Sequence, residues 1–112
     1  MRKRRNKVEI GSSNIFADLG LPDAEDMLLK STIVIELRCL IEERSLSQTA
    51  AAKLIGINQA DLSKILRGRF RGYSEARLMR MLTAFSQDVE ITTRPHRKAG
   101  EIGKIVFKRR AA

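Results

Sequence analysis

The feature that most constrains this chain is the run from Leu46 to Gly68, which predicts two short helices joined by a tight turn. Ser47 stands where an N-cap is needed. Gly56 stands where the first helix must stop, because glycine enters the left-handed conformation without steric cost. Asn58 can cap the second helix, and Ile57 is expected to anchor the turn in the core.

Apolar residues recur at helical spacing in both segments, so each helix has one side to bury. Ala52 is small enough to let the two helices cross closely. The residues expected on the buried sides are Ala51, Ala52, Leu54, Ile55, Leu62, Ile65 and Leu66. The glycine turn alone would also fit an ordinary helical hairpin, but the combination is typical of a helix-turn-helix.

The outer side of the second helix carries short or amide-bearing side chains, namely Gln59, Ala60, Ser63 and Lys64. Such side chains can reach base edges in a major groove. We interpret Asp61 as a first-turn acid that faces the helix N-terminus rather than as a base contact. The segment therefore indicates binding to double-stranded DNA.

An excess of positive charge also favours a polyanionic partner. The 112 residues include 22 Lys and Arg against 13 Asp and Glu, a formal net charge of +9. Phosphate contacts made by such a chain release counterions. One Tyr, four Phe and no Trp argue against a stacking platform for single-stranded RNA, so duplex DNA is favoured. In the loop after the second helix, Arg67, Arg69 and Arg71 are expected on the sugar-phosphate backbone.

Little in the sequence favours catalysis or a metal site. Cys39 is the only cysteine, which excludes an intrachain disulfide and a cysteine-based zinc site and suggests a buried structural thiol. His96 is the only histidine, and no carboxylate pair or phosphate-binding glycine loop accompanies it. We therefore expect no enzyme activity, no cofactor and no metal.

Targeting signals are equally sparse. No apolar run reaches the roughly 18 residues of a membrane span. The basic amino terminus is not followed by the apolar segment of a signal peptide. The expected location is the bacterial cytoplasm, on the nucleoid when the protein is bound to DNA, with no membrane partner.

The order of patterns along the chain predicts four parts: a basic flexible arm over 1–13, a helical domain over 14–87, an extension over 88–108 and a basic tail over 109–112. Within the helical domain we expect a short element over 14–21, a long helix from about residue 23 to Glu43, and a helix capped by Ser74. The expected core face of that last helix comprises Leu78, Met81, Leu82 and Phe85.

The extension changes from a helical to a strand period. Val89 and Ile91 alternate with polar residues over 88–94, Pro95 ends the run, and 104–108 is a second candidate strand. An isolated two-stranded unit is marginal. The two runs are therefore expected to form either a hairpin or a pairing across a dimer axis, with Val89 and Ile91 as dimer contacts.

Residues 14–95 resemble the XRE-type (Cro/repressor-like) antitoxins of the HigA group. The resemblance is carried by the leader Asn14-Ile-Phe-Ala-Asp-Leu-Gly-Leu-Pro-Asp23, the helix-turn-helix, and Asp88-Val-Glu-Ile after the last helix. It implies a mainly α fold, a five-helix DNA-binding domain with a short C-terminal β strand or hairpin. It also implies a homodimer that represses its own operon and neutralises a RelE/HigB-like ribonuclease toxin.

The same resemblance assigns roles to the motif residues. The phosphate-binding amide falls on Gln48, next to the capping Ser47, which is also expected near phosphate. The base-reading positions fall on Gln59, Ala60, Ser63 and Lys64. Three alternatives stay open: a stand-alone XRE-type regulator without a toxin, a toxin-neutralising protein with little DNA binding, and an RNA-binding variant of the motif.

Overall fold

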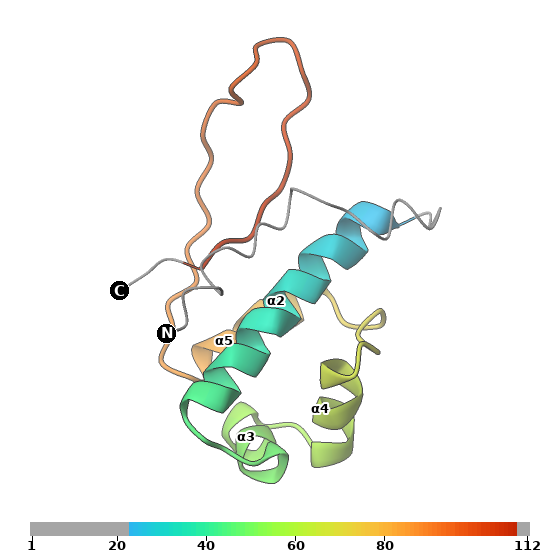
Figure 1. Cartoon of the computed structure of the whole chain (residues 1–112), viewed down its shortest axis with the longest axis vertical. Helices are drawn as coiled ribbons and strands as arrows, with labels where there is room; N and C mark the ends of the chain where they lie inside the picture. The colour runs from blue at the N-terminus through green and yellow to red at the C-terminus, as the bar shows by residue number, and fades with distance from the viewer. Residues whose placement is uncertain (1–22, 110–112) are drawn as a thin grey trace.

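The computed structural model describes residues 23–109, and the following observations concern that part of the chain. Its helices are α2 (Ala24–Glu43), α3 (Gln48–Ile55), α4 (Gln59–Leu66) and α5 (Glu75–Thr83). The long α2 crosses the molecule with α5 packed along it, and α3 and α4 pack together at one end (Figure 1). The expected long helix, motif helices and last helix are confirmed. The basic N-terminal segment expected over 1–13 and the short element expected over 14–21 lie outside the described residues.

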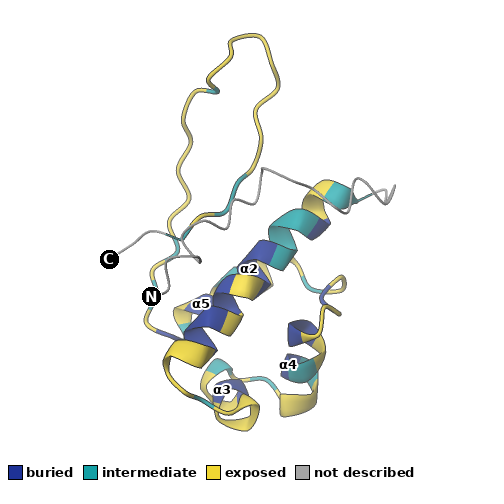
Figure 2. Ribbon diagram, in the orientation of Figure 1, coloured by how far each residue is buried: buried dark blue, intermediate teal, exposed yellow. Residues whose placement is uncertain are grey.

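A single core joins the four helices. Its largest fully buried side chains are Ile33 and Leu37 from α2, Leu62 and Ile65 from α4, Leu78 and Leu82 from α5, and Phe85 beyond it. Figure 2 shows these buried segments where the helices meet, whereas the long excursion after α5 is almost wholly exposed. The expected core face of α5 is therefore confirmed, including Met81.

The helix-turn-helix buries most of the residues expected to be inside. Ala51 and Ala52 are buried, and Ile55 and Ile57 are half-buried. The prediction that Leu54 is buried is wrong, because this residue is 46% exposed. An eight-residue helix with one neighbouring motif helix can bury only a narrow stripe. The alanines fill that stripe at the crossing. Cys39 is buried, as expected of a structural thiol.

After α5, residues 88–108 form a long loop that projects away from the helices (Figure 1). This loop is called the arm below. Two expectations are corrected at this point. The residues from 23 to 109 contain four helices rather than five, and the expected C-terminal β strand or hairpin is wrong, because no strand occurs there. The limbs of the arm approach each other, with a Cβ built on Gly103 3.9 Å from that of His96. A two-stranded ribbon without a third strand or a helix to cover it has little to stabilise its ladder.

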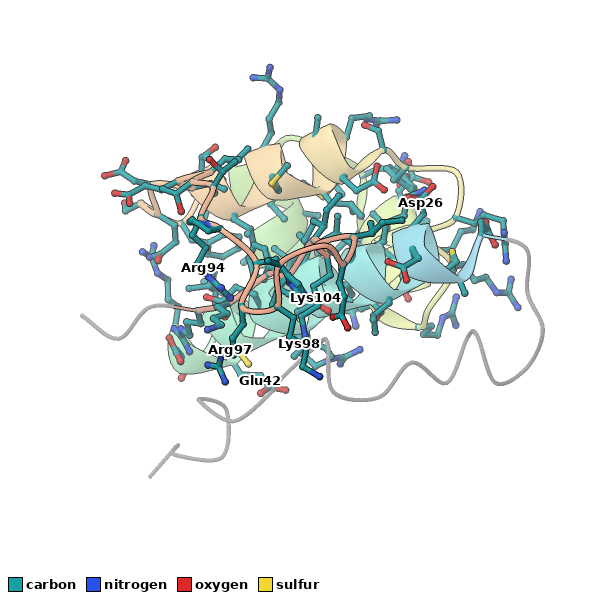
Figure 3. The ribbon with its side chains drawn as sticks, turned by 90° about the horizontal axis from the view of Figure 1, so that it is seen from above. Asp26, Glu42, Arg94, Arg97, Lys98 and Lys104 are labelled. Carbon is teal, nitrogen blue, oxygen red and sulfur yellow. The ribbon has the colours of Figure 1, made fainter. Side chains whose placement is uncertain are left out.

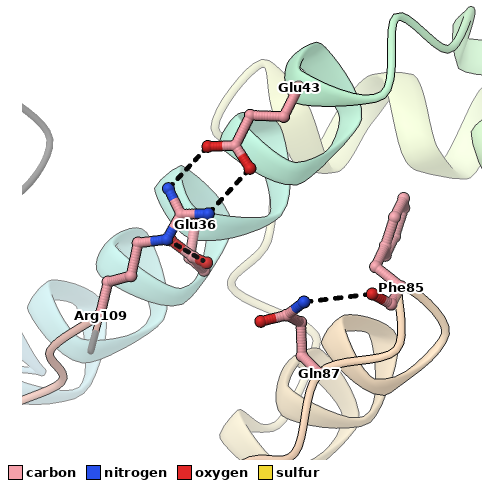
Figure 4. A network of polar contacts seen from close by, with 5 residues as sticks. All are labelled: Glu36, Glu43, Phe85, Gln87 and Arg109. Carbon is pink, nitrogen blue, oxygen red and sulfur yellow. Dashed lines mark hydrogen bonds and ion pairs between the residues drawn. The ribbon is translucent and has the colours of Figure 1, made fainter. Parts of the chain in front are cut away.

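The arm is fastened to the helical domain at both ends. Val89 and Phe107 are half-buried and pack on the core. At its return, Arg109 donates from Nη1 and Nη2 to the two carboxylate oxygens of Glu43, both at 2.8 Å, and its Nε lies 3.2 Å from Glu36 Oε2 (Figure 4). The hydrogen bond to Glu43 is the main reason that the pKa of Arg109 is raised, against the opposing effect of partial burial. Arg109, which we expected in a basic tail, therefore closes the arm into a loop.

Candidate nucleic-acid interface

The first motif helix begins and ends as its sequence predicts. The Ser47 hydroxyl accepts a hydrogen bond from the amide of Ala50 at 3.1 Å. Gly56 adopts φ +95°, and its amide donates to Ala52 O at 2.8 Å, which closes α3. Ile57 N donates to the same carbonyl at 3.0 Å. This double capture of one carbonyl is a Schellman-like ending that turns the chain directly into the second motif helix.

The second motif helix, α4, presents the predicted outer residues to solvent. Its cap is Asn58, whose Oδ1 accepts from the amide of Asp61 at 2.8 Å. Leu62, Ile65 and Leu66 are buried. Among the expected base-reading residues, Gln59, Ala60 and Lys64 are exposed and Ser63 is half-buried. Asp61 lies in the first turn, where a carboxylate interacts favourably with the helix dipole.

A side-chain hydrogen bond joins the starts of the two motif helices. Gln59 Nε2 donates to Gln48 Oε1 at 3.1 Å, and both side chains are exposed. A primary amide has two donors and one acceptor oxygen, so the Gln59 amide keeps one N–H and its oxygen for a ligand. A donor and an acceptor side by side match the N7 and N6 edge of adenine in a major groove. Gln48 thus orients the amide that the sequence assigns to base reading.

The loop after α4 carries two of the expected phosphate contacts outward. Arg67 and Arg69 are exposed. Their backbone amides return to the end of α4, Arg67 N to Ser63 O at 3.1 Å and Arg69 N to Lys64 O at 2.9 Å. These hydrogen bonds hold the backbone of the loop at the C-terminal end of α4, so both exposed arginines start from that end of the helix.

The third arginine of the loop differs from the expectation. Arg71 Nη1 forms an ion pair and hydrogen bond with Asp23 Oδ2. Lys30 Nζ in α2 also donates to Arg71 O at 3.0 Å. These two contacts fasten the α4–α5 loop to the start of α2. Arg71 is thus occupied by a carboxylate, whereas Arg67 and Arg69 point their charge to solvent.

A further contact, which the sequence did not indicate, fixes the other end of α4. Arg38 in α2 donates from Nη2 to the backbone carbonyl of Leu66. A cation at a helix C-terminus satisfies a terminal carbonyl and favours the helix dipole. Arg38 and Leu66 are 28 residues apart, and the partners of Asp23 and Lys30 are still farther away in the sequence. No local pattern indicates such contacts, so the roles of these three residues follow only from the packing of the helices.

The arm carries its own charged tip at the opposite end of the molecule from α3 and α4 (Figure 1). Its basic residues include Arg94, Arg97, Lys98 and Lys104 (Figure 3). Of the two expected dimer contacts, Ile91 is 79% exposed, whereas Val89 is half-buried against the core of its own chain. Val89 and Ile91, the two expected dimer contacts, therefore lie in different environments.

The described part of the chain contains no metal-binding cluster, and its one histidine lies on the arm. His96 Nε2 lies 3.4 Å from Glu101 Oε1 near the exposed tip of the arm. No group of three or more His, Cys, Asp or Glu side chains within residues 23–109 is placed to hold a metal ion. None of the helices found there is long and apolar enough to cross a bilayer.

Comparison with known proteins agrees with this geometry. Residues 15–94 match the family described as a helix-turn-helix domain. The fold is similar to a solved structure described as an XRE-family transcriptional regulator, with a TM-score of 0.70 and 38% sequence identity over 75% of this chain and 94% of that one. No curated protein matches the sequence.

Proposed function

Because this chain belongs to the helix-turn-helix domain family, we propose that it is a sequence-specific repressor of transcription that binds a palindromic DNA operator as a homodimer. The observation that carries the proposal is the Gln48–Gln59 hydrogen bond, which holds an exposed amide at the start of α4. Arg67 and Arg69 supply positive charge beside it. The similar XRE-family structure, described as a transcriptional regulator, supports the same function.

A two-fold dimer gives this proposal a measurable geometry. The two α4 helices would enter successive major grooves about 34 Å apart, one turn of B-DNA, or at a multiple of that spacing. Light scattering would give the mass of the complex, and footprinting would give the spacing of the protected half-sites. A monomer that protects a single half-site would contradict the proposed dimer.

Base reading and phosphate binding can be separated by substitution. We expect Gln59→Ala to weaken binding to the operator by about 1 to 3 kcal/mol, with little effect on random duplex DNA, because an amide contact to a base edge is lost. Arg69→Ala should weaken binding to both DNAs and reduce the slope of log K against log salt by about one. Titrations at several salt concentrations would measure both effects. Equal losses on both DNAs for Gln59→Ala would show that α4 does not read sequence.

We further propose that the protein is the antitoxin of a type II toxin–antitoxin pair and controls its own operon. This part rests on the resemblance of residues 14–95 to the HigA group. Co-expression with the product of the adjacent gene would test it: an antitoxin should co-purify with that product and relieve its toxicity. If the protein binds its operator but no such partner co-purifies, the protein is a stand-alone regulator and not an antitoxin. Neither role requires catalysis, and we propose none.

A further inference from the structure

The end of the arm carries positive charge that the rest of the described chain does not neutralise. Four basic side chains, here called the basic tip, are exposed and lie around the arm when it is seen from above (Figure 3): Arg94, Arg97, Lys98 and Lys104. Among residues 23–109, no ion pair includes any of these four side chains. The basic tip is therefore available to an external anion.

The one carboxylate near these cations is directed to a histidine. Glu101 Oε1 lies 3.4 Å from His96 Nε2, across the end of the arm. A Cβ built on Gly103 lies 3.9 Å from that of His96, so the two limbs stay close and bring their cations together. From residue 94 to 104 the sequence has four Lys and Arg against this single acid. A compact excess of positive charge favours a polyanion with closely spaced charges.

The basic tip lies far from the surface that we propose reads bases. The arm projects from the end of the molecule opposite α3 and α4 (Figure 1), and the longest dimension of the structure is 47 Å. Val89 and Phe107 pack on the core, so both ends of the arm are held to the helical domain. Exposed charges farther apart than about 10 Å at 0.1 M salt act almost independently. A duplex in contact with α4 therefore leaves the basic tip facing away from it.

We infer that the basic tip is a second DNA-binding site, which holds the phosphate backbone of a duplex other than the one read by α4, so that the protein joins two DNA segments. The inference goes beyond the proposed function but rests on it in one respect, because operator binding places the tip among neighbouring chromosomal DNA at high local concentration. Phosphate contacts carry no sequence information, so this site should accept any duplex.

Other anionic partners fit the arm less well. Single-stranded nucleic acid is held by aromatic rings that stack on its bases, and the one phenylalanine of the arm, Phe107, packs on the core. The arm also exposes Ile91, Ile102 and Ile105. These isoleucines lie on both limbs, and no helix gathers them into the continuous apolar face of a membrane-surface segment.

Capture of a second duplex tests the inference. The protein is saturated on an immobilised operator duplex, a fluorescent duplex of random sequence is added, and the captured DNA is measured per bound protein. Four phosphate contacts predict that log K for capture falls with log salt with a slope of about −3.6. Capture by the wild type should therefore weaken about 150-fold between roughly 50 and 200 mM salt.

Neutral substitutions identify the contacts. Arg97→Gln/Lys98→Gln should halve the slope, to about −1.8, and weaken capture about tenfold or more at roughly 50 mM salt. Its affinity for the operator should be unchanged. The matched control is Lys53→Gln/Arg80→Gln, which removes the same charge from exposed positions on α3 and α5 and should keep the wild-type slope. Circular dichroism should show the same helix content in both variants.

A substitution at the other surface shows which site holds the added duplex. Arg69→Ala should leave capture per bound protein unchanged, because Arg69 lies at the end of α4 and not on the arm. A loss of capture in Arg69→Ala equal to that in Arg97→Gln/Lys98→Gln would mean that a second copy of α4 holds the added duplex, and would overturn the inference.

Two competitors identify the polyanion. Polyglutamate and phosphatidylserine vesicles, at the same concentration of negative charge, should leave most of the captured duplex in place. Duplex DNA carries one charge per about 1.7 Å and releases condensed counterions, whereas extended polyglutamate carries one per about 3.5 Å. Displacement by polyglutamate or by vesicles would overturn the inference and assign the basic tip to an acidic protein or to a membrane surface.

The outcomes separate this inference from the proposed function. Capture that is lost in Arg97→Gln/Lys98→Gln and kept in the control would support the second site. Operator-bound protein that captures no second duplex would overturn the second site and leave the proposed function intact. A protein that prefers no operator over random DNA would overturn the proposed function, and an unchanged salt slope of the tip variant on random duplex would then overturn the second site as well.

Discussion

At the scale of single residues, the structure separates the three arginines of the α4–α5 loop. All three side chains are exposed, but Arg71 is paired with Asp23. We predict that Arg71→Ala reduces the salt slope of DNA binding by less than half as much as Arg69→Ala, because the charge of Arg71 is already balanced by a carboxylate. Salt titrations on random duplex DNA would measure this. Equal reductions would mean that Arg71 leaves Asp23 to bind phosphate. The Arg71–Asp23 ion pair is exposed to solvent and should contribute little to the free energy of unfolding, about 0 to 1 kcal/mol.

Local residue roles were largely predictable from the sequence, and long-range roles were not. The caps Ser47, Asn58 and Ser74 each accept the amide hydrogen bond that their positions predict. These contacts span three residues, so the sequence order itself specifies them. The partners of Arg71 and Arg109 lie 48 and 66 residues away, and only the packing of the helices brings them together.

At the scale of elements, the junction between α3 and α4 depends on one backbone conformation. Gly56 has φ +95°, and a Cβ built there meets no atom within 4 Å, so the cost of a side chain is conformational rather than steric. We predict that Gly56→Ala lowers the free energy of unfolding by about 1 to 2 kcal/mol. Gly72→Ala is the matched control, because it has equal space without a positive φ, and it should be neutral or stabilising. Urea unfolding of both variants measures the difference, and similar values for the two would contradict the explanation.

Among the elements, the helices were predictable and the arm was not. The long apolar periodicity of α2 and α5 leads to burial in one core, so the pattern is sufficient to place them. Alternation over 88–94 predicted a strand, and this prediction is wrong because no strand occurs within residues 23–109. A ladder requires a partner strand, which a local pattern in the sequence does not supply.

At the scale of the whole molecule, Arg109 decides whether the arm is a closed loop or a free end. Its side chain is 25% exposed, and it binds Glu43 through two hydrogen bonds and lies beside Glu36, whose side chain is 11% exposed. We predict that Arg109→Gln releases the return limb, because a neutral amide cannot replace a bidentate ionic contact and leaves two poorly solvated carboxylates close together. Phe107, which packs on the core, should then become accessible to chymotrypsin. Its cleavage rate should rise about tenfold or more, as a local loss of about 1.5 to 3 kcal/mol implies.

Lys108→Gln is the control, since that side chain is exposed and its substitution should leave the cleavage rate unchanged. Mass spectrometry would locate the cut, and circular dichroism should show that α2 to α5 persist. Unchanged protection of Phe107 in Arg109→Gln would show that apolar packing alone holds the arm against α2.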